Sequence, residues 1–372
     1  MKKKVLVMGN GNKWQVNEKL VSLGYEPVFV LYSEPKSFDF EYVVISKEQA
    51  ASKTYDLSVF EPYTSQNIQG LIVCSEWYVE MAAELREKYF PQLEYLDVNQ
   101  IDNIRDKLFF KRTLNQYKIP TTKFSEITPE SSYPEIKKIL GTSFLLKPRK
   151  GLLAKGIAII SCLNDWESWV GAQKDATDQF YAEEYLQDIK EYCCDTIVVD
   201  GNIVAMFPGE YTVDCLKSNK IHCGIGVNFP GFLPESKINE LKNIVAEFIK
   251  LHGIRNSFCH IEFFYHEGVW KFGEVGCRPA GGYQMPTESY IVDHDLIFHY
   301  LKTFLKSENV SHNTFKVKRP YVGYYLYPKK IGLVKKITTN LKLPWILESK
   351  IYVKEQQVLD YEDSSVTMAA SI

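Results

Sequence analysis

Two glutamates occupy a β-hairpin that the sequence predicts on either side of residue 267. Glu262 lies in the first predicted strand, 257–265, and Glu274 in the second, 269–275. Neighbouring strands can direct both carboxylates into one cleft. A carboxylate at an otherwise apolar strand position costs desolvation free energy unless a cation accompanies it. Mg²⁺ prefers oxygen ligands and is often held by one or two carboxylates together with phosphate oxygens. The pair predicts a magnesium site beside bound phosphates, with a solvated, ion-paired hairpin as the alternative.

The residues around these glutamates could bind the reacting groups. Arg278 follows the second glutamate, and its planar guanidinium could bind a phosphoryl group or a developing acyl oxyanion. Gly281 and Gly282 would let the backbone approach a ligand closely. His260 is two residues before the first glutamate and therefore shares its face of the strand. His260 could contact a substrate or be a structural histidine, hydrogen-bonded in the cleft wall.

Three lysines upstream are candidates for binding phosphates. Lys107 lies early in the helical pattern 103–117, and Lys147 ends an apolar strand pattern. Lys155 belongs to a basic, glycine-containing loop, 149–156, which would suit a mobile flap over phosphates. Each ammonium is a compact charge that can neutralise phosphate oxygens. An exposed surface position is the alternative for each lysine.

A strand pattern that stops at a polar turn could bind the base of a nucleotide. It contains Glu183, Glu184 and Leu186, and its backbone could pair with an adenine edge, while Glu191 could accept ribose hydroxyls. An ordinary strand end is the alternative. The sequence contains no GxxxxGK[ST] loop, protein-kinase motif or serine-nucleophile motif.

Composition narrows the class of protein. The 372 residues carry 44 Lys plus Arg against 46 Asp plus Glu, so no basic field attracts nucleic acid or anionic lipid. The apolar run 5–8 is too short for a signal peptide or a membrane span, which predicts a cytoplasmic location. The eight cysteines show no CxxC spacing, and we expect reduced, buried thiols rather than metal ligands.

Apolar periodicity predicts an α/β beginning and an α+β middle. Residues 1–102 alternate strand and helix patterns, which predicts a doubly wound parallel-sheet domain. The middle contains two predicted hairpins and a strong amphipathic helix, 235–252. Short strand patterns at 319–327, 333–337 and 350–354 predict a small β-rich C-terminal segment, 316–372.

The order of these segments resembles the ATP-grasp superfamily over about residues 1–315. The segments that carry the resemblance are Arg105-Asp106-Lys107, Leu146-Lys147-Pro148-Arg149, 151–156, Glu183-Glu184-Tyr185-Leu186, Glu191, His260-Ile261-Glu262 and 274–282. The chain looks closest to the amino-acid and dipeptide ligases, whose end motif is similar to Glu-x-Gly-x-Arg-Pro-x-Gly-Gly.

The resemblance implies a fold and a set of site roles. Residues 103–315 would form an ATP-grasp domain with subdomains of about 103–182 and 183–315. ATP would lie between them, with Lys107, Lys147 and Lys155 at the phosphates. The segment that begins at Glu183 would bind adenine, and Glu191 would bind ribose. Glu262 and Glu274 would hold Mg²⁺, for which Mn²⁺ is an alternative, and Arg278 would bind the phosphoryl or acyl group.

The implied activity is ADP-forming ligation of a small carboxylate to an amine through an acyl phosphate. A homodimer is one assembly that is compatible with this interpretation. A carboxylase-like or purine-pathway-like enzyme that activates bicarbonate is one rival interpretation, and an inactive nucleotide-binding regulator is another. Three departures from the family pattern bear on these alternatives. Gly276 stands where many members have a metal-binding asparagine, the loop has Leu152-Leu153-Ala154 where glycines are usual, and the chain ends early in the expected C-terminal domain.

Overall fold

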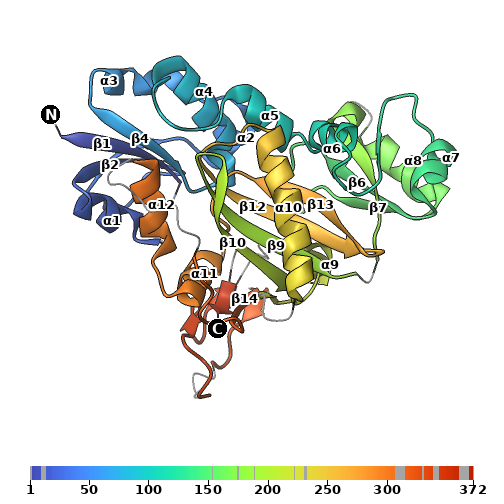
Figure 1. The fold of residues 1–372 in the computed structure, drawn as a ribbon. Helices are drawn as coiled ribbons and strands as arrows, with labels where there is room; N and C mark the ends of the chain where they lie inside the picture. Colours follow the sequence, from blue (N-terminus) through green and yellow to red (C-terminus); the bar gives the residue numbers. More distant parts are fainter. Residues whose placement is uncertain are drawn as a thin grey trace.

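The computed structural model describes most of the chain and contains four sheets among the described residues (Figure 1). The described residues are 2–9, 14–152, 154–173, 176–187, 189–221, 223–229, 233–305, 315–328, 331–337, 343–359 and 368–371. An N-terminal layered unit and a small lobe flank a large central sheet, and the C-terminal stretch extends below it.

The N-terminal unit is a four-stranded parallel sheet in the order β3-β2-β1-β4. On β1, Val5 and Val7 enter one apolar cluster while Leu6 and Met8 enter another on the opposite face. Both faces are therefore covered, which explains the uninterrupted apolar run. The elements are β1 Lys3–Met8, α1 Val16–Ser22, β2 Tyr25–Leu31, β3 Glu41–Val44, α2 Lys47–Ser52, α3 Glu61–Thr64, β4 Ile68–Val73 and α4 Val79–Tyr89, with 3-10 turns at Leu57–Phe60 and Glu76–Tyr78.

The predicted helix 103–117 is wrong in its extent, because two helices divide this region. Helix α5 is Val98–Arg105 and helix α6 is Lys107–Gln116. Asp106 separates them, and its carboxylate accepts hydrogen bonds from the backbone N–H groups of Leu108 and Phe109. A side chain that binds the free N–H groups of a new first turn starts a helix there.

The small lobe is an antiparallel sheet in the order β5-β8-β6-β7, covered by helices α7 and α8. The predicted hairpin around the basic loop is confirmed, since β6 pairs antiparallel with β7. The elements are β5 Phe124–Glu126, α7 Tyr133–Leu140, β6 Phe144–Pro148, β7 Ala158–Ile160, α8 Leu163–Ala172 and β8 Phe180–Glu184, with a 3-10 turn at Thr177–Gln179.

The central sheet has eight strands in the order β13-β12-β9-β10-β11-β14-β18-β16. Every residue of β9 is buried, because helix α10 covers one face and helices α11 and α12 pack on the other (Figure 1). The elements are β9 Glu191–Val199, β10 Asn202–Tyr211, α9 Cys215–Ile221, β11 Ile225–Asn228, α10 Glu235–Leu251, β12 Ser257–His266, β13 Val269–Gly276, α11 Gln284–Val292 and α12 Leu296–Phe304.

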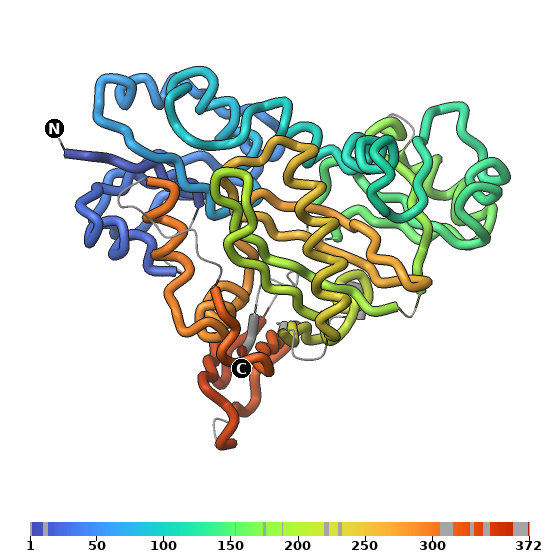
Figure 2. Tube along the Cα trace, viewed as in Figure 1, coloured from blue at the N-terminus to red at the C-terminus, as the bar shows by residue number. Residues whose placement is uncertain are grey.

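The C-terminal stretch adds strands to the central sheet and forms a separate two-stranded ribbon, β15-β17. Figure 2 shows this stretch gathered at the lower edge of the molecule. The predicted strands 333–337 and 350–354 are wrong in their extent, because only Leu333 of the first range and Lys350 and Ile351 of the second belong to paired strands. The elements are β14 Gly323–Pro328, β15 Gly332–Leu333, β16 Lys350–Ile351, β17 Val358–Leu359 and β18 Met368–Ser371.

The predicted fold class, α/β followed by α+β, is confirmed by these sheets. The domain borders near residues 102 and 315 stay predictions. No helix of the described ranges combines the length and the apolar character that crossing a membrane requires.

Candidate active site

A cavity of about 900 Å³ opens between the small lobe, the central sheet and the N-terminal unit. A volume of this size is typical of small-ligand sites. Every candidate site residue from the sequence lines it: Lys107, Lys147, Lys155, Glu183, Glu184, Leu186, Glu191, His260, Glu262, Glu274, Arg278, Gly281 and Gly282. Side chains up to 175 positions apart in the chain, as from Lys107 to Gly282, thus share one cavity. Their individual roles remain proposals.

Lys147 is held in the cavity wall by a buried carboxylate. Its Nζ lies 3.1 Å from Glu183, whose side chain is 2% exposed. The same carboxylate lies 3.3 Å from the Nζ of Lys111 and accepts a 2.6 Å hydrogen bond from the hydroxyl of Thr122. Because these partners occupy the Glu183 carboxylate, its side chain positions Lys147. The predicted adenine contact would then fall to the backbone of this strand.

The pKa values of this cluster reflect burial and pairing together. Burial alone would raise the pKa of Glu183, but Lys111 and Lys147 hold that pKa well below its ordinary value. Burial lowers the pKa of Lys111, and its attraction to Glu183 compensates only in part. Burial also lowers the pKa of Lys147, but the attraction to Glu183, together with that to Glu274 and Glu191, outweighs it, and the pKa rises. Lys147 is therefore a cation at neutral pH, as phosphate binding requires.

Lys107 connects helix α6 with the basic loop and with Glu274. Its Nζ donates to the carbonyl of Gly151 at 2.9 Å and lies 3.3 Å from the Glu274 carboxylate. Burial would raise the pKa of Glu274, but Lys107 is the foremost of three nearby cations that keep it below its ordinary value. Arg149, at the start of the loop, forms a forked pair with Asp106. The loop is thus anchored at its first residues; Leu153 lies outside the described residues, and the predicted mobility stays a prediction.

Arg278 is held by Glu76, which the sequence reasoning missed. The Nε of Arg278 donates to Glu76 at 2.7 Å, and the other Glu76 oxygen lies 2.9 Å from Arg105 Nη1. A Cβ on Gly276 would lie 2.6 Å from Glu76 Oε2. Glycine at 276, where many members of the superfamily have asparagine, therefore leaves the space that this carboxylate occupies.

Replacing Gly276 with alanine is expected to displace Glu76 and to lower the free energy of unfolding by about 1–3 kcal/mol, the usual cost of an added group in a packed site. Glu76 cannot yield freely because two arginines hold it. Urea unfolding measures the loss. Gly281→Ala is the matched control, since a Cβ there meets nothing within 4 Å. Equal stability of the two variants would contradict the proposed steric conflict.

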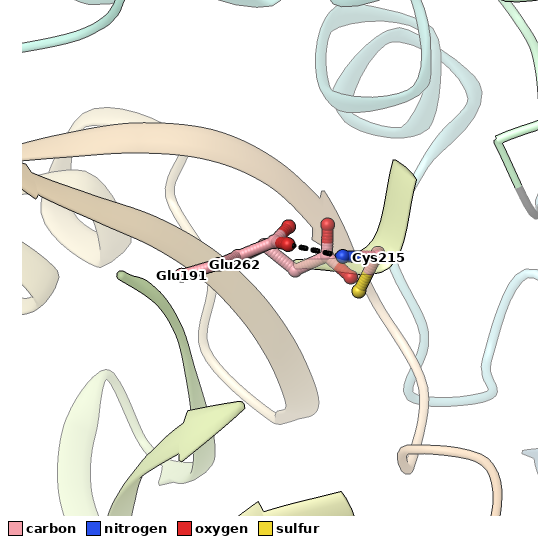
Figure 3. A group of neighbouring side chains, drawn as sticks. All are labelled: Glu191, Cys215 and Glu262. Atoms are coloured by element: carbon pink, nitrogen blue, oxygen red, sulfur yellow. Dashed lines mark hydrogen bonds between the residues drawn. The ribbon is translucent and has the colours of Figure 1, made fainter. Parts of the chain in front are cut away.

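Glu191, for which the resemblance implies a ribose-binding role, lies beside Glu262 in the cavity. Figure 3 shows the two carboxylates directed toward each other and toward Cys215, whose backbone N–H donates to Glu191 at 2.7 Å. Their nearest ligand atoms lie within 4.8 Å of one another. Burial and the neighbouring Glu262 raise the pKa of Glu191 to about 8. A buried and a half-buried carboxylate in such proximity suit a divalent cation, so this part of the cavity fits the predicted metal.

His260 belongs to a row of buried polar side chains. Its Nδ1 lies 2.6 Å from Asp195, which is fully buried, and fully buried Glu288 of α11 lies against Asp195. Burial lowers the pKa of His260, but Asp195 raises it to about 9. The predicted hydrogen-bonded histidine in the cleft wall is therefore present, and the other ring nitrogen lies 3.7 Å from Glu262.

Glu184 also has a partner, because Lys271 Nζ lies 2.9 Å from its carboxylate. Gly282 adopts a φ of +61°, a conformation that side chains with a Cβ rarely take, beside Leu326 of β14. The sequence predictions assigned no role to five residues that hold site side chains: Glu76, Arg105, Lys111, Asp195 and Glu288. Two signals were present. Asp195 interrupts an apolar strand, and Glu76 follows the carboxyl end of a parallel strand, where ligands often bind.

Comparisons with known proteins identify which proteins are similar to this chain in sequence and in fold. No family model matches the chain. The L-arginine-specific L-amino acid ligase of Bacillus subtilis is 26% identical over 278 residues, covering 70% of this chain and only 64% of that protein. The structure of an L-amino acid ligase from Bacillus licheniformis matches with a TM-score of 0.75 at 16% identity, over 100% of this chain and 92% of that chain. In sequence and in fold, this chain is therefore similar to the ATP-grasp ligases.

Other ATP-grasp structures share the whole fold. The biotin carboxylase domain of a 2-oxoglutarate carboxylase from Hydrogenobacter thermophilus matches with a TM-score of 0.70 at 17% identity, over 100% of this chain and 85% of that chain. That structure contains MgADP, ADP and bicarbonate. The resemblance predicted from sequence is confirmed at the level of the superfamily, whose members perform different reactions on one fold.

Proposed function

We propose that this chain is an ATP-dependent, ADP-forming ligase that joins an amino acid or another small carboxylic acid to an amine. The supporting observation is the shared cavity, which brings three cations, Lys107, Lys147 and Arg278, together with the carboxylates of Glu262 and Glu274. Triphosphate binding requires such positive charge, and a magnesium site requires such oxygen donors. The amino acid ligases among the similar proteins support the choice of substrates.

The reaction would proceed in two steps in this cavity. A substrate carboxylate oxygen attacks the γ-phosphorus of ATP, the bond to the β-phosphate oxygen breaks, and an acyl phosphate and ADP form. An amine then attacks the acyl carbon, phosphate leaves, and the ammonium protons pass to solvent. Lys107 and Lys147 neutralise phosphate oxygens, and Arg278 stabilises the charge on the transferred phosphoryl group and on the tetrahedral oxyanion.

The metal proposed for this reaction is Mg²⁺. Glu262 and Glu274 would hold it, and when bound it would neutralise phosphate charge. The backbone of residues 184–186, which lines the cavity, would pair with the adenine edge. Glu191, already close to Glu262, would contribute to the same negative region.

ADP release measured across a matrix of paired amino acids tests the proposal, and turnover is expected only when both a carboxylate and an amine are present. Glu274→Gln should lower kcat/KM at limiting Mg²⁺ by at least about 10-fold, since outer-shell changes alone cost 10–100-fold in metal affinity. Glu267→Gln is the control, because that residue lies in the exposed turn of the same hairpin.

Two outcomes would favour the rival interpretations. ADP release that requires bicarbonate and no amino acid would favour a carboxylase-like enzyme. Nucleotide binding without ADP release under every mixture would favour a regulatory protein. Full turnover by Glu274→Gln would show that the metal assignment is wrong.

A further inference from the structure

His260 is oriented by residues that are buried more deeply than it is. Asp195 is the direct neighbour of His260 on strand β9 and holds His260 Nδ1 at 2.6 Å. Asp195 and Glu288 are each 0% exposed, whereas the His260 side chain is 11% exposed and lines the cavity. One ring nitrogen thus points into the protein core. The imidazole ring then presents its other nitrogen, Nε2, on the opposite side.

The Nε2 atom of His260 faces the carboxylate of Glu262. The two atoms are 3.7 Å apart, which is too long for a hydrogen bond. A single ion can contact both, because nitrogen and carboxylate ligands each lie about 2.0–2.2 Å from a bound first-row metal ion. His260 and Glu262 also share one face of β12, so both side chains project from the same side of the strand.

The strand beside His260 carries no side chain at the facing position. The register pairs His260 with Gly276 of β13. Arg278, a cation whose charge acts on His260, is already paired with Glu76 at 2.7 Å. The charge of Arg278 is therefore largely compensated, and it does not exclude a second cation near Nε2.

We infer that His260 Nε2 is a direct ligand of the divalent cation held by Glu262. The inference rests on the proposed function, which places that cation in this cavity. A buried carboxylate on the outer ring nitrogen is the usual support of a metal-bound histidine, since it fixes the orientation and tautomer of the ring. A mixed nitrogen and oxygen site favours Mn²⁺ over Mg²⁺, which prefers oxygen alone. A proton and the metal compete for Nε2.

Pulsed electron paramagnetic resonance tests this directly on the full chain. Protein labelled with ¹⁵N-histidine is loaded with Mn²⁺ and a non-hydrolysable ATP analogue. A directly coordinated histidine gives a nitrogen coupling that changes from the ¹⁴N to the ¹⁵N pattern on labelling, whereas adenine and backbone nitrogens keep the ¹⁴N pattern. We expect the ¹⁵N coupling in the wild type and in His294→Gln, which alters an exposed histidine, and its loss in His260→Gln.

A second measurement examines the supporting carboxylate. Asp195→Asn is expected to weaken nucleotide-dependent Mn²⁺ binding by about 10–100-fold. Mg²⁺ binding should change much less, because Mg²⁺ depends less on the nitrogen ligand. A merely structural role for Asp195 would weaken the binding of both metals equally, and that result would overturn the inference.

The outcomes separate this inference from the function on which it rests. Mn²⁺ that binds only with nucleotide but shows no histidine coupling would overturn the ligand assignment and leave the proposed ligase intact. Failure of the wild type to bind Mn²⁺ or Mg²⁺ with any adenine nucleotide would overturn both.

Discussion

Replacing Arg278 with lysine is expected to lower kcat for ligation by about 10²–10³-fold, the usual effect of removing one donor to a developing oxyanion. The Nε of Arg278 donates to Glu76 and its Nη1 donates to the carbonyl of Pro279, so the guanidinium plane is fixed where it lines the cavity. A lysine keeps the charge but cannot make both contacts and still reach a ligand. Nucleotide affinity should change by less than about 3-fold, since Lys107 and Lys147, which we propose bind the phosphates, are unchanged.

Single-turnover ADP formation and the Kd for an ATP analogue separate these two effects. Arg319→Lys is the matched control, because Arg319 packs over the ring of Tyr290 outside the cavity. Its kcat should equal that of the wild type. If Arg278→Lys retained wild-type kcat, or lost nucleotide binding in proportion to kcat, the proposed role of Arg278 would fail.

Replacing Glu183 with glutamine is expected to lower the free energy of unfolding by about 3–5 kcal/mol, the range for removing one partner of a buried ion pair. Lys111 is fully buried, and the change would remove the carboxylate that pairs with its ammonium and with that of Lys147. Urea unfolding measures the difference. Glu126→Gln breaks an exposed pair with Arg112 and should cost at most about 1 kcal/mol. Adding Lys111→Met to Glu183→Gln should recover part of the lost free energy of unfolding, because it removes the unpaired buried ammonium.

The loss of stability in Glu183→Gln is also expected to depend on pH. Because the pKa of Glu183 in the folded protein is below its ordinary value, its stabilising contribution is complete above about pH 4.3, the usual pKa of glutamate. The contribution decreases as the pH falls and more of the unfolded chain becomes protonated. The difference in the free energy of unfolding between the wild type and Glu183→Gln should therefore become smaller in acid. A difference in the free energy of unfolding that is small at pH 7, or that increases in acid, would contradict the assignment of Glu183 as a charged partner.

Local patterns in the sequence predicted most of the fold. The hairpin expected at 257–265 and 269–275 is present as β12 and β13, because strand alternation and a turn are properties of neighbouring residues. Helix α11 was not predicted. Its apolar and polar residues are buried together, which removes the one-sided spacing that indicates a surface helix.

The residues of the candidate site were predicted only in part, because only some of them belong to patterns of neighbouring residues. The cations and carboxylates that face the cavity belong to recognisable segments, so their types and order indicated a common ligand. The residues that hold these cations and carboxylates in place could not be recognised from the sequence, because each one acts through a partner far along the chain. Glu76 is 202 positions from Arg278, and Asp195 is 65 positions from His260. A single sequence carries no sign of such pairings before the fold brings them together.

The absence of a side chain at Gly276 has a consequence for how this protein can evolve. Every other amino acid adds an atom where Glu76 now lies, so substitution at 276 requires a change in the 3-10 turn that follows β4 of the N-terminal sheet. Positions 76 and 276 are therefore expected to covary among homologues. Sequences with a larger residue at 276 should carry a shorter one at 76, together with a different anchor for the arginine.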